Sequence, residues 1–224
     1  MLKQLIASLV LFGVLPAAVA AADLSRYRDF EFGAGLPVVA KQAGMPPSQA
    51  KAIHRRPVLI QTLEWRPQPL GRSTKAEPVQ AVLFSFYDGE LYRIAVEYDP
   101  YQTKGLTTED IVEAISVNYG LAERSPDVNK TLQGPFGEKE DVVARWQDSQ
   151  YRYDLVHLPY GPTFKLIGVS KKMEAPAEAA VLEAKRLDDQ DAPSREAARL
   201  AGEQEAAKVT LEKARLVNKP NFRP

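Results

Sequence analysis

The chain has 224 residues, 45% hydrophobic and 26% charged, with 29 basic and 29 acidic side chains and no cysteine. The charge balance argues against general binding to nucleic acid, because such binding depends on an excess of Lys and Arg. The lack of cysteine excludes disulfides, thiolate nucleophiles, zinc ribbons and a lipid-anchored cysteine.

The first twenty residues predict a cleavable export signal. Lys3 gives a positive start, an apolar run follows over 5–15, and an A-x-A cleavage pattern ends at Ala20. The apolar run is about half of the roughly 20 residues that a transmembrane helix needs. We therefore expect a signal peptide over 1–20, a mature chain that begins at Ala21 without a transmembrane segment, and a periplasmic or extracellular location.

Two hairpins, about sixty residues apart, predict a tandem repeat. The first joins strands 79–87 and 90–98 through Asp88-Gly89, which is a strong hairpin turn. The second centres on Asp148-Ser149. Its strands would be residues 142–147 and 150–158.

A helical pattern precedes each hairpin. The second helix, 107–119, has Thr107 and Asp110 as a capping pair and Gly120 as its end. The first is interrupted by prolines and predicts two short helices, 37–43 and 48–54. Further strands are expected over 57–65, 127–134 and 163–170. The prediction is an α+β domain over 21–172, with two tandem helix-plus-antiparallel-strand repeats forming a two-layer arrangement.

The remaining residues, 173–224, predict a charged, Ala-rich helical C-terminal arm. Pro193 separates two expected helices, 177–189 and 194–217. Large apolar residues are few and form no continuous stripe, so we expect a chain ended after Lys172 to keep nearly all of its thermal stability. Contacts of the arm with the domain would then come from Leu182 and Leu187.

The segment Phe32-Gly33-Ala34-Gly35-Leu36, followed by Val38-Val39 and Gly44, resembles the helix opening of a group of bacterial exported modules. This group contains the outer-membrane assembly lipoproteins and β-lactamase-inhibitor-like proteins. The resemblance implies one or two short helices before an antiparallel sheet, sometimes in tandem. It covers the helix opening and the element order, and this chain differs in having no lipidation cysteine and an added helical tail.

The sequence contains no motif for catalysis, metal binding or cofactor binding. His54 and His157 have no acidic neighbour at ligand spacing. Segment 99–110 fails as a calcium loop, because Tyr101 and Thr103 occupy ligand positions. Nucleophile motifs and phosphate-binding glycine loops are also missing. We expect no cofactor and no metal.

Charge is distributed unevenly along the domain. Residues 41–75 carry seven bases and one acid, whereas 76–118 carry eight acids and two bases. The basic segment predicts a contact for a charged partner through Arg55, Arg56 and Arg66. The alternative is that the neighbouring segments neutralise one another.

A second candidate contact lies on the second hairpin. A turn at Asp148-Ser149 would place Arg145 opposite Arg152, an unfavourable pair unless an acid lies between them. The two arginines either contact an acidic partner or are neutralised by Asp154. On this pairing, Arg145→Glu would keep the fold and slightly raise its stability.

The first hairpin is expected to be apolar on both faces of the sheet. Phe84 and Phe86 would lie on one face, and the other face would carry Leu83, Tyr92, Ile94 and Val96. The other repeat, the tail helix or a partner protein would cover this second face.

Together these features favour an exported, non-enzymatic binding or scaffold module of the bacterial envelope, with another envelope protein as its partner. Two alternatives remain open: a secreted hydrolase that uses carboxylates, and a structural envelope protein that oligomerises through its C-terminal helix.

Overall fold

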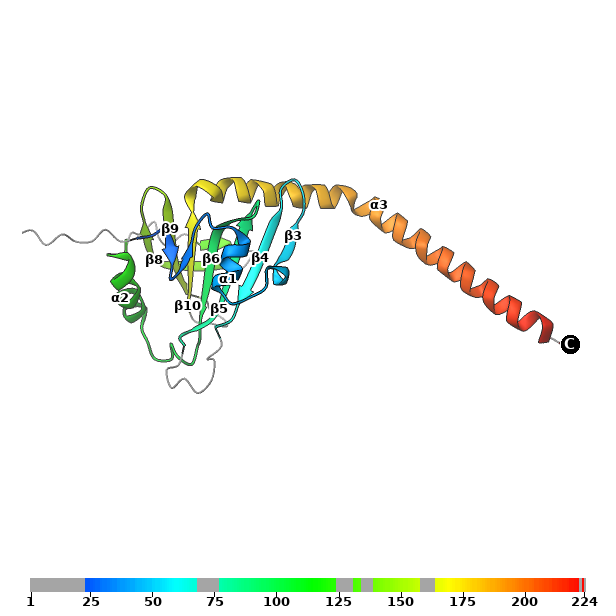
Figure 1. Ribbon diagram of the computed structural model, residues 1–224, viewed down its shortest axis with the longest axis horizontal. Helices are drawn as coiled ribbons and strands as arrows, with labels where there is room; N and C mark the ends of the chain where they lie inside the picture. Colours follow the sequence, from blue (N-terminus) through cyan, green and yellow to red (C-terminus); the bar gives the residue numbers. More distant parts are fainter. Residues whose placement is uncertain are drawn as a thin grey trace, which may run out of the picture.

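The computed structural model describes residues 23–67, 77–123, 131–133, 139–157, 164–221 and 223. The expected signal peptide and the expected start at Ala21 lie outside the described residues. The body is an eight-stranded antiparallel sheet in the order β3-β4-β5-β6-β10-β9-β8-β7, and a long helix, α3, leaves it (Figure 1). The strands are β3 (Lys51–His54), β4 (Ile60–Trp65), β5 (Val79–Tyr87), β6 (Glu90–Tyr98), β7 (Thr131–Gln133), β8 (Lys139–Gln147), β9 (Tyr151–His157) and β10 (Phe164–Ser170).

The remaining elements are a two-stranded ribbon and helices. They are β1 (Arg26–Tyr27), β2 (Phe30–Glu31), α1 (Leu36–Gln42), α2 (Thr108–Tyr119), α3 (Lys171–Asn218) and two short 3-10 helices, η1 (Pro47–Gln49) and η3 (Lys219–Asn221). The α+β class is confirmed. The two hairpins lie in one sheet with β10 between β6 and β9, and the tandem repeat stays a prediction.

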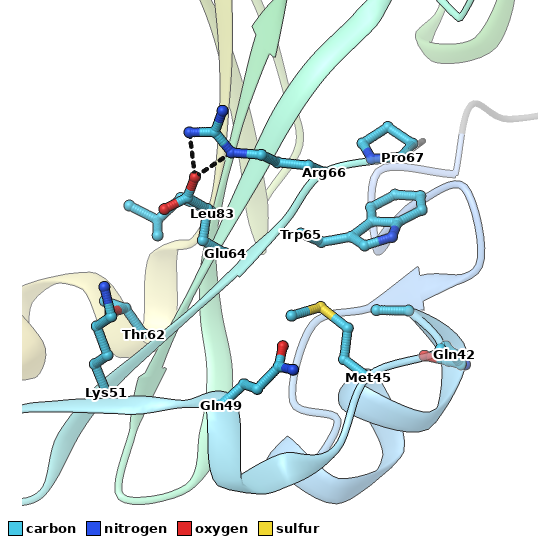
Figure 2. A pocket seen from close by; sticks show the side chains of 12 residues that line it. Gln42, Met45, Gln49, Lys51, Thr62, Glu64, Trp65, Arg66, Pro67 and Leu83 are labelled. Carbon is cyan, nitrogen blue, oxygen red and sulfur yellow. Dashed lines mark hydrogen bonds and ion pairs between the residues drawn. The ribbon is translucent and has the colours of Figure 1, made fainter. Parts of the chain in front are cut away.

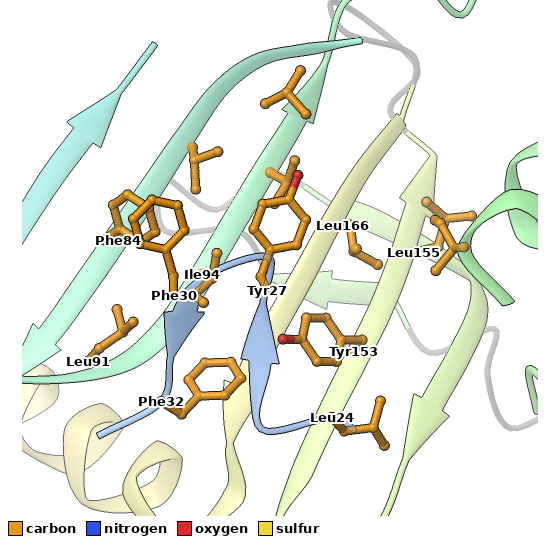
Figure 3. Packing of buried hydrophobic residues seen from close by; sticks show 14 of the residues in the cluster. Leu24, Tyr27, Phe30, Phe32, Phe84, Leu91, Ile94, Tyr153, Leu155 and Leu166 are labelled. Atoms are coloured by element: carbon orange, nitrogen blue, oxygen red, sulfur yellow. The ribbon is translucent and has the colours of Figure 1, made fainter. Parts of the chain in front are cut away.

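One face of the sheet carries the main core, under α1, α2 and the β1-β2 ribbon. Phe30 of the ribbon packs on Phe84, with ring centroids 4.5 Å apart, and Figure 3 shows the ribbon lying across the strands on this face. Ile111 and Ile115 of α2 belong to the same buried cluster. The start of α2 is fixed by the predicted capping box, in which Thr107 Oγ1 accepts a hydrogen bond from Asp110 N.

The first hairpin turns at Asp88-Gly89 as predicted, but the prediction that Ile94 and Val96 lie opposite the Phe face is wrong. Phe84 pairs directly with Ile94, and both belong to the main core. The register shifts beside Phe86, where Tyr92 is the extra residue of a bulge. A bulge moves the side-chain alternation by one residue, so the residues after it change face.

The second hairpin turns one residue later than predicted. Asp148 N donates to Tyr151 O at 3.0 Å, and Asp148 Oδ1 accepts hydrogen bonds from Gln150 N and Tyr151 N. The turn therefore lies at Ser149-Gln150, because the Asp148 side chain stabilises it from the preceding position. The change pairs Arg145 with Asp154 rather than with Arg152.

The predicted helix over 48–54 is also wrong in its second half. The chain forms only one 3-10 turn, η1, before it becomes extended at Ala50 and continues as β3. Lys51 pairs with Thr62 of β4. The exposed edge of β4 supplies backbone partners to this segment, and sheet pairing overrides a weak helical pattern.

The arm is a single helix, and the predicted break at Pro193 is absent. Side chains assist the turn before the proline: Ser194 Oγ donates to Asp191 O at 2.9 Å, and Arg195 Nη2 donates to Asp188 O at 2.7 Å. The helix changes direction beyond its sheet-bound half (Figure 1). Proline removes one helical hydrogen bond and bends a helix, but flanking helix-forming residues can continue it.

The first half of α3 packs on the second face of the sheet, where the tail helix was one of the expected covers. Its buried side chains are small: Ala177, Ala180 and Ala184 are each no more than 6% exposed. Leu182 is 67% exposed, so the predicted contact through this residue is wrong, whereas Leu187 is half-buried. Alanines let the helix backbone come close to the strands.

Candidate binding groove at the edge of the sheet

The two arginines of the second hairpin form a structural network. Arg145 Nε lies 2.5 Å from Asp154 Oδ1, and Arg152 Nε lies 2.8 Å from Asp154 Oδ2. Arg152 also donates to Glu174 of α3. Asp154 is 1% exposed, so its carboxylate neutralises both arginines within the protein. Of the two interpretations of Arg145 and Arg152, the structure shows the neutralisation by Asp154, and a contact with a partner stays a prediction.

The network also corrects the expectation for Arg145→Glu. This substitution would place a second carboxylate beside buried Asp154, so it would destabilise the fold. Burial opposes the charge of Arg152, but its hydrogen bond to Glu174 and the charge of Asp154 raise the pKa of its guanidinium.

The arginines of the basic segment separate in space. Arg56 pairs with Asp191 and with Asp188 of α3, the second at 3.7 Å. Arg66 pairs with Glu64 of β4 at 2.6 Å. Arg55 is exposed and makes no ion pair with any described residue. The tail thus neutralises Arg56, and Glu64 of β4 neutralises Arg66. Of these three arginines, Arg66 lines the groove described next.

This cavity is a groove of about 880 Å³ beside the edge strands β3 and β4 (Figure 2). Its walls include Met45, Gln49, Lys51, Thr62, Trp65 and Arg66. The connection between α1 and η1 forms one side, and the end of β4 forms the other. The groove therefore lies where β3 would continue if the chain did not turn away at η1.

Local sequence explains why Met45 reaches the groove. Gly44 adopts a positive φ of 67° and ends α1, while Met45 N donates to Ala40 O at 2.8 Å. This is a Schellman motif, in which a glycine in the left-handed conformation ends the helix and turns the chain back across its last turn. The following prolines keep the chain extended as far as η1.

The outer edge of β4 is open along this groove. β3 pairs with β4 only through Ile60, Gln61 and Thr62, whereas β5 pairs with β4 as far as Trp65. Among the described residues, none pairs with the outer side of β4 beyond Thr62.

The direction of the open backbone groups follows from one hydrogen bond. Asp88 N donates to Leu59 O at 2.9 Å, so the backbone of Leu59 faces β5. Alternate residues of an antiparallel strand direct their N–H and C=O groups to opposite sides. The backbone N–H and C=O groups of Thr62 and Glu64 therefore point away from β5. Lys51 pairs with Thr62, and the backbone N–H and C=O of Glu64 are left facing the groove.

The groove combines an apolar anchor with a positive rim. Trp65 packs edge-on against Phe30, with ring centroids 5.3 Å apart, and this contact holds the indole at the groove wall. Met45 lies on the other side of the groove (Figure 2). Lys51 is exposed, and its amine makes no ion pair with any described residue. Such a site can take one apolar and one acidic side chain of an extended peptide.

The groove residues offer binding chemistry rather than proton transfer. Glu64, the carboxylate among the groove residues, is bound by Arg66. Within the described part of the chain, no group of three or more His, Asp or Glu side chains is placed to hold a metal ion. His54 Nδ1 lies 4.0 Å from Asp188, and His157 packs against Phe164.

No described helix is both long and apolar enough to cross a bilayer.

Sequence reasoning found Arg66 but missed Met45, Trp65 and the open edge at Glu64. The segment Gly44-Met45-Pro46-Pro47 offered one clue, because a methionine between a helix end and two prolines has no apolar partner within its own segment. Its neighbour Trp65 is twenty residues away, so only the tertiary fold brings the two together.

Comparison with known proteins gives little. No family model matches the chain, and no curated protein matches it. Among solved structures, the chain is similar to a cysteine-rich secretory protein from Staphylococcus aureus, with 10% sequence identity and a TM-score of 0.32. The similarity covers 66% of this chain and 46% of that one.

Proposed function

We propose that the chain is an exported, non-enzymatic binding module of the bacterial envelope that holds an extended segment of a partner protein along the outer edge of β4. The observation that carries this proposal is the open backbone of Glu64 beside a groove with an apolar wall. Export rests on the predicted signal peptide over 1–20.

Strand addition accounts for the features of the groove. An extended peptide that continues the line of β3 would exchange backbone hydrogen bonds with Glu64, and main-chain bonds give such complexes their affinity. Its alternate side chains would point to opposite faces of the sheet. An apolar side chain would lie between Trp65 and Met45, and an acidic one would approach Lys51.

The test separates the backbone of Glu64 from its charge. Glu64→Pro removes the outward N–H, and proline is tolerated on edge strands. Glu64→Gln keeps the N–H and removes the carboxylate. A random linear peptide library is selected on the wild-type protein, and the enriched peptides are measured against both variants. We expect apolar–acidic peptides that bind wild type and Glu64→Gln, but bind Glu64→Pro at least tenfold more weakly.

A photocrosslinking residue locates the bound peptides. Placed at Gln49, on the groove wall, it should capture them, whereas at Val117, which is 81% exposed and outside the groove, it should not. Thermal melts show whether Glu64→Pro is folded. Peptides that bind all three proteins equally, or crosslink equally from Val117, would contradict strand addition at β4.

The exposed half of α3 favours a second candidate function, oligomerisation through this helix. Leu211 and Leu216 are 71% and 65% exposed. Sedimentation of the full chain and of a chain ended after Asp191 decides between the two candidates. An oligomer that becomes a monomer on truncation supports the structural role. A monomer in both cases leaves the groove as the binding surface. The hydrolase alternative has no support at the groove, where Glu64 is held by Arg66.

A further inference from the structure

A second cavity lies on the core face of the sheet, between α2 and the β1-β2 ribbon. It has a volume of about 560 Å³, within the ~300–1,000 Å³ typical of small-ligand sites. Leu166 of β10 lies at its base, and Ile111 and Ile115 line its α2 side. Tyr27 belongs to the opposite side, and Figure 3 shows it beside Leu166 on the face of the sheet.

The fold holds the two walls apart. The capping box at Thr107 fixes where α2 begins, and the indole Nε1 of Trp146 donates to Gly120 O at 3.0 Å near its end. The ribbon is held from the other side by the contact of Phe30 with Phe84. Each wall therefore has its own contact with the sheet, and the space between them is a preformed cleft.

Polar side chains also line the cleft, among them three tyrosines and Gln102, Thr103 and Asn118. Tyr119 Oη donates to Arg26 O at 3.2 Å, which links α2 to the ribbon across the cleft. Tyr98 also lines the cleft, and burial raises the pKa of its hydroxyl far above the ordinary value. Burial raises the pKa of Tyr27 and Tyr119 to about 12, so both remain neutral phenols near neutral pH.

Two arginines lie at the rim of the cleft. Arg26 Nε donates to Asp23 at 2.7 Å, and Arg28 Nη2 donates to Glu77 at 2.6 Å. Each guanidinium has five N–H groups, so both arginines keep donors for another acceptor. The cleft thus has an apolar interior, phenol hydroxyls and a rim at which two arginines, each paired with one carboxylate, keep free N–H donors.

We propose that this cleft binds a long-chain carboxylate, with its alkyl chain against Leu166, Ile111 and Ile115 and its carboxylate at Arg26 and Arg28. The apolar walls exclude a purely polar ligand, because burying unpaired polar groups is unfavourable. The guanidinium groups select an anionic headgroup, because they match carboxylate geometry. This site is separate from the groove at β4 and does not depend on the proposed partner segment.

Titration calorimetry of the full chain with laurate, below its micelle threshold, tests the proposal. Two matched ligands define the chemistry: dodecyltrimethylammonium has the same chain with the opposite charge, and acetate has the head without the chain. We expect laurate to bind with one site per chain, and each of the other two to bind at least tenfold more weakly.

Variants of one helix test the position of the site. Ala114 is exposed and lines the cleft, so Ala114→Trp fills the cleft without changing the core. Val117→Trp adds the same ring on the same helix, outside the cleft. Ala114→Trp should weaken laurate binding at least tenfold, Val117→Trp should leave it unchanged, and Arg28→Gln should weaken it severalfold. Equal binding by Ala114→Trp and wild type, equal binding of the cationic ligand, or no binding of laurate by wild type would overturn the proposal.

Discussion

The two halves of α3 have similar compositions but different surroundings. Over 171–191 the helix packs on the sheet through buried alanines and is tied to strands by ion pairs. Over 192–218 every residue is exposed, and the helix extends about 40 Å into solvent at ~1.5 Å per residue. Ion pairs one turn apart, such as Glu196 with Arg199 and Glu212 with Arg215, support this half.

The difference teaches that an alanine-rich helix docks where the surface beneath it is apolar and offers partners for its charges. Ala180 and Ala201 belong to the same residue type, yet Ala180 is 6% exposed and Ala201 belongs to the exposed class. The surface beneath the first half supplies Arg152 of β9 and Arg56, which follows β3, as partners for helix carboxylates. Position in the tertiary fold, rather than helix propensity, decides which half is structural.

The largest expected effect comes from ending the chain at the two boundaries that the structure suggests. A chain ended after Lys172 loses the docked half and the Glu174 partner of Arg152, so we expect a loss of about 3 kcal/mol or more in unfolding free energy. A chain ended after Asp191 keeps the docked half and should unfold at nearly the wild-type urea concentration. This reverses the expectation from sequence that the domain is stable without its tail.

Equal stability of the two shortened chains would contradict a structural role for the docked half. Urea unfolding followed by circular dichroism and by Trp fluorescence reports both outcomes. Trp146 lies in the main core on the opposite face, so its signal follows the whole sheet rather than the helix itself.

The next effect concerns the carboxylate beneath the helix. Asp154→Asn should cost about 3–5 kcal/mol of unfolding free energy, because it leaves Arg145 and Arg152 partly buried with no full counter-charge between them. Glu212→Gln, which alters one ion pair of the exposed half, is the control and should change the stability by less than about 0.5 kcal/mol. An Asp154→Asn protein as stable as wild type would mean that the network is not structural.

A smaller effect should distinguish buried from exposed alanines. Ala180→Leu inserts a larger side chain between α3 and the sheet and should cost about 1–3 kcal/mol. Ala201→Leu makes the same change in the exposed half and should stay within about 0.5 kcal/mol of wild type. Thermal melts of the two variants give this comparison directly. Similar losses in both would show that helix propensity, and not docking, sets the stability.

Much of the fold was predictable where the determining contacts are local. The Asp88-Gly89 turn and the capping box at Thr107 each depend on residues within one short segment, and both are as predicted. The bulge at Tyr92, the turn at Ser149-Gln150 and the strand at β3 were not predictable. The strand β3 depends on pairing with β4, whereas the bulge and the turn are shifts of one residue within a hairpin, which the pattern of residue types does not specify.

The candidate site was less predictable than the fold. Charge counts along the sequence pointed to Arg55, Arg56 and Arg66, but counts do not show that α3 neutralises Arg56 from 135 residues away. The groove depends instead on where β3 stops pairing with β4, which is a property of register. The sequence shows which residue types a segment contains, but it does not show which distant residues become their neighbours in the fold.

The smallest expected effect lies at the end of the docked half, where Arg56 meets Asp188 and Asp191. The hydrogen bond that Arg56 donates to Asp191 lowers the pKa of this carboxyl below its ordinary value of 3.8. A carboxyl with a lowered pKa in the folded state stabilises that state above its unfolded pKa, and the contribution is lost as pH falls through the folded value. Residues 185–191 should therefore open more readily below about pH 4, and at high salt as well, because the pair is exposed.

Amide hydrogen exchange of residues 185–191 measures this opening, with exchange at 212–216 as the internal reference. Arg56→Gln should raise exchange over 185–191 at neutral pH and remove most of its dependence on acid, while exchange in the exposed half stays the same. Arg215→Gln, which breaks an ion pair of the exposed half, should raise exchange at 212–216 and leave exchange at 185–191 unchanged. If Arg56→Gln leaves the exchange of 185–191 unchanged, the alanines alone hold the docked half, and its boundary lies at Leu187 rather than at Asp191.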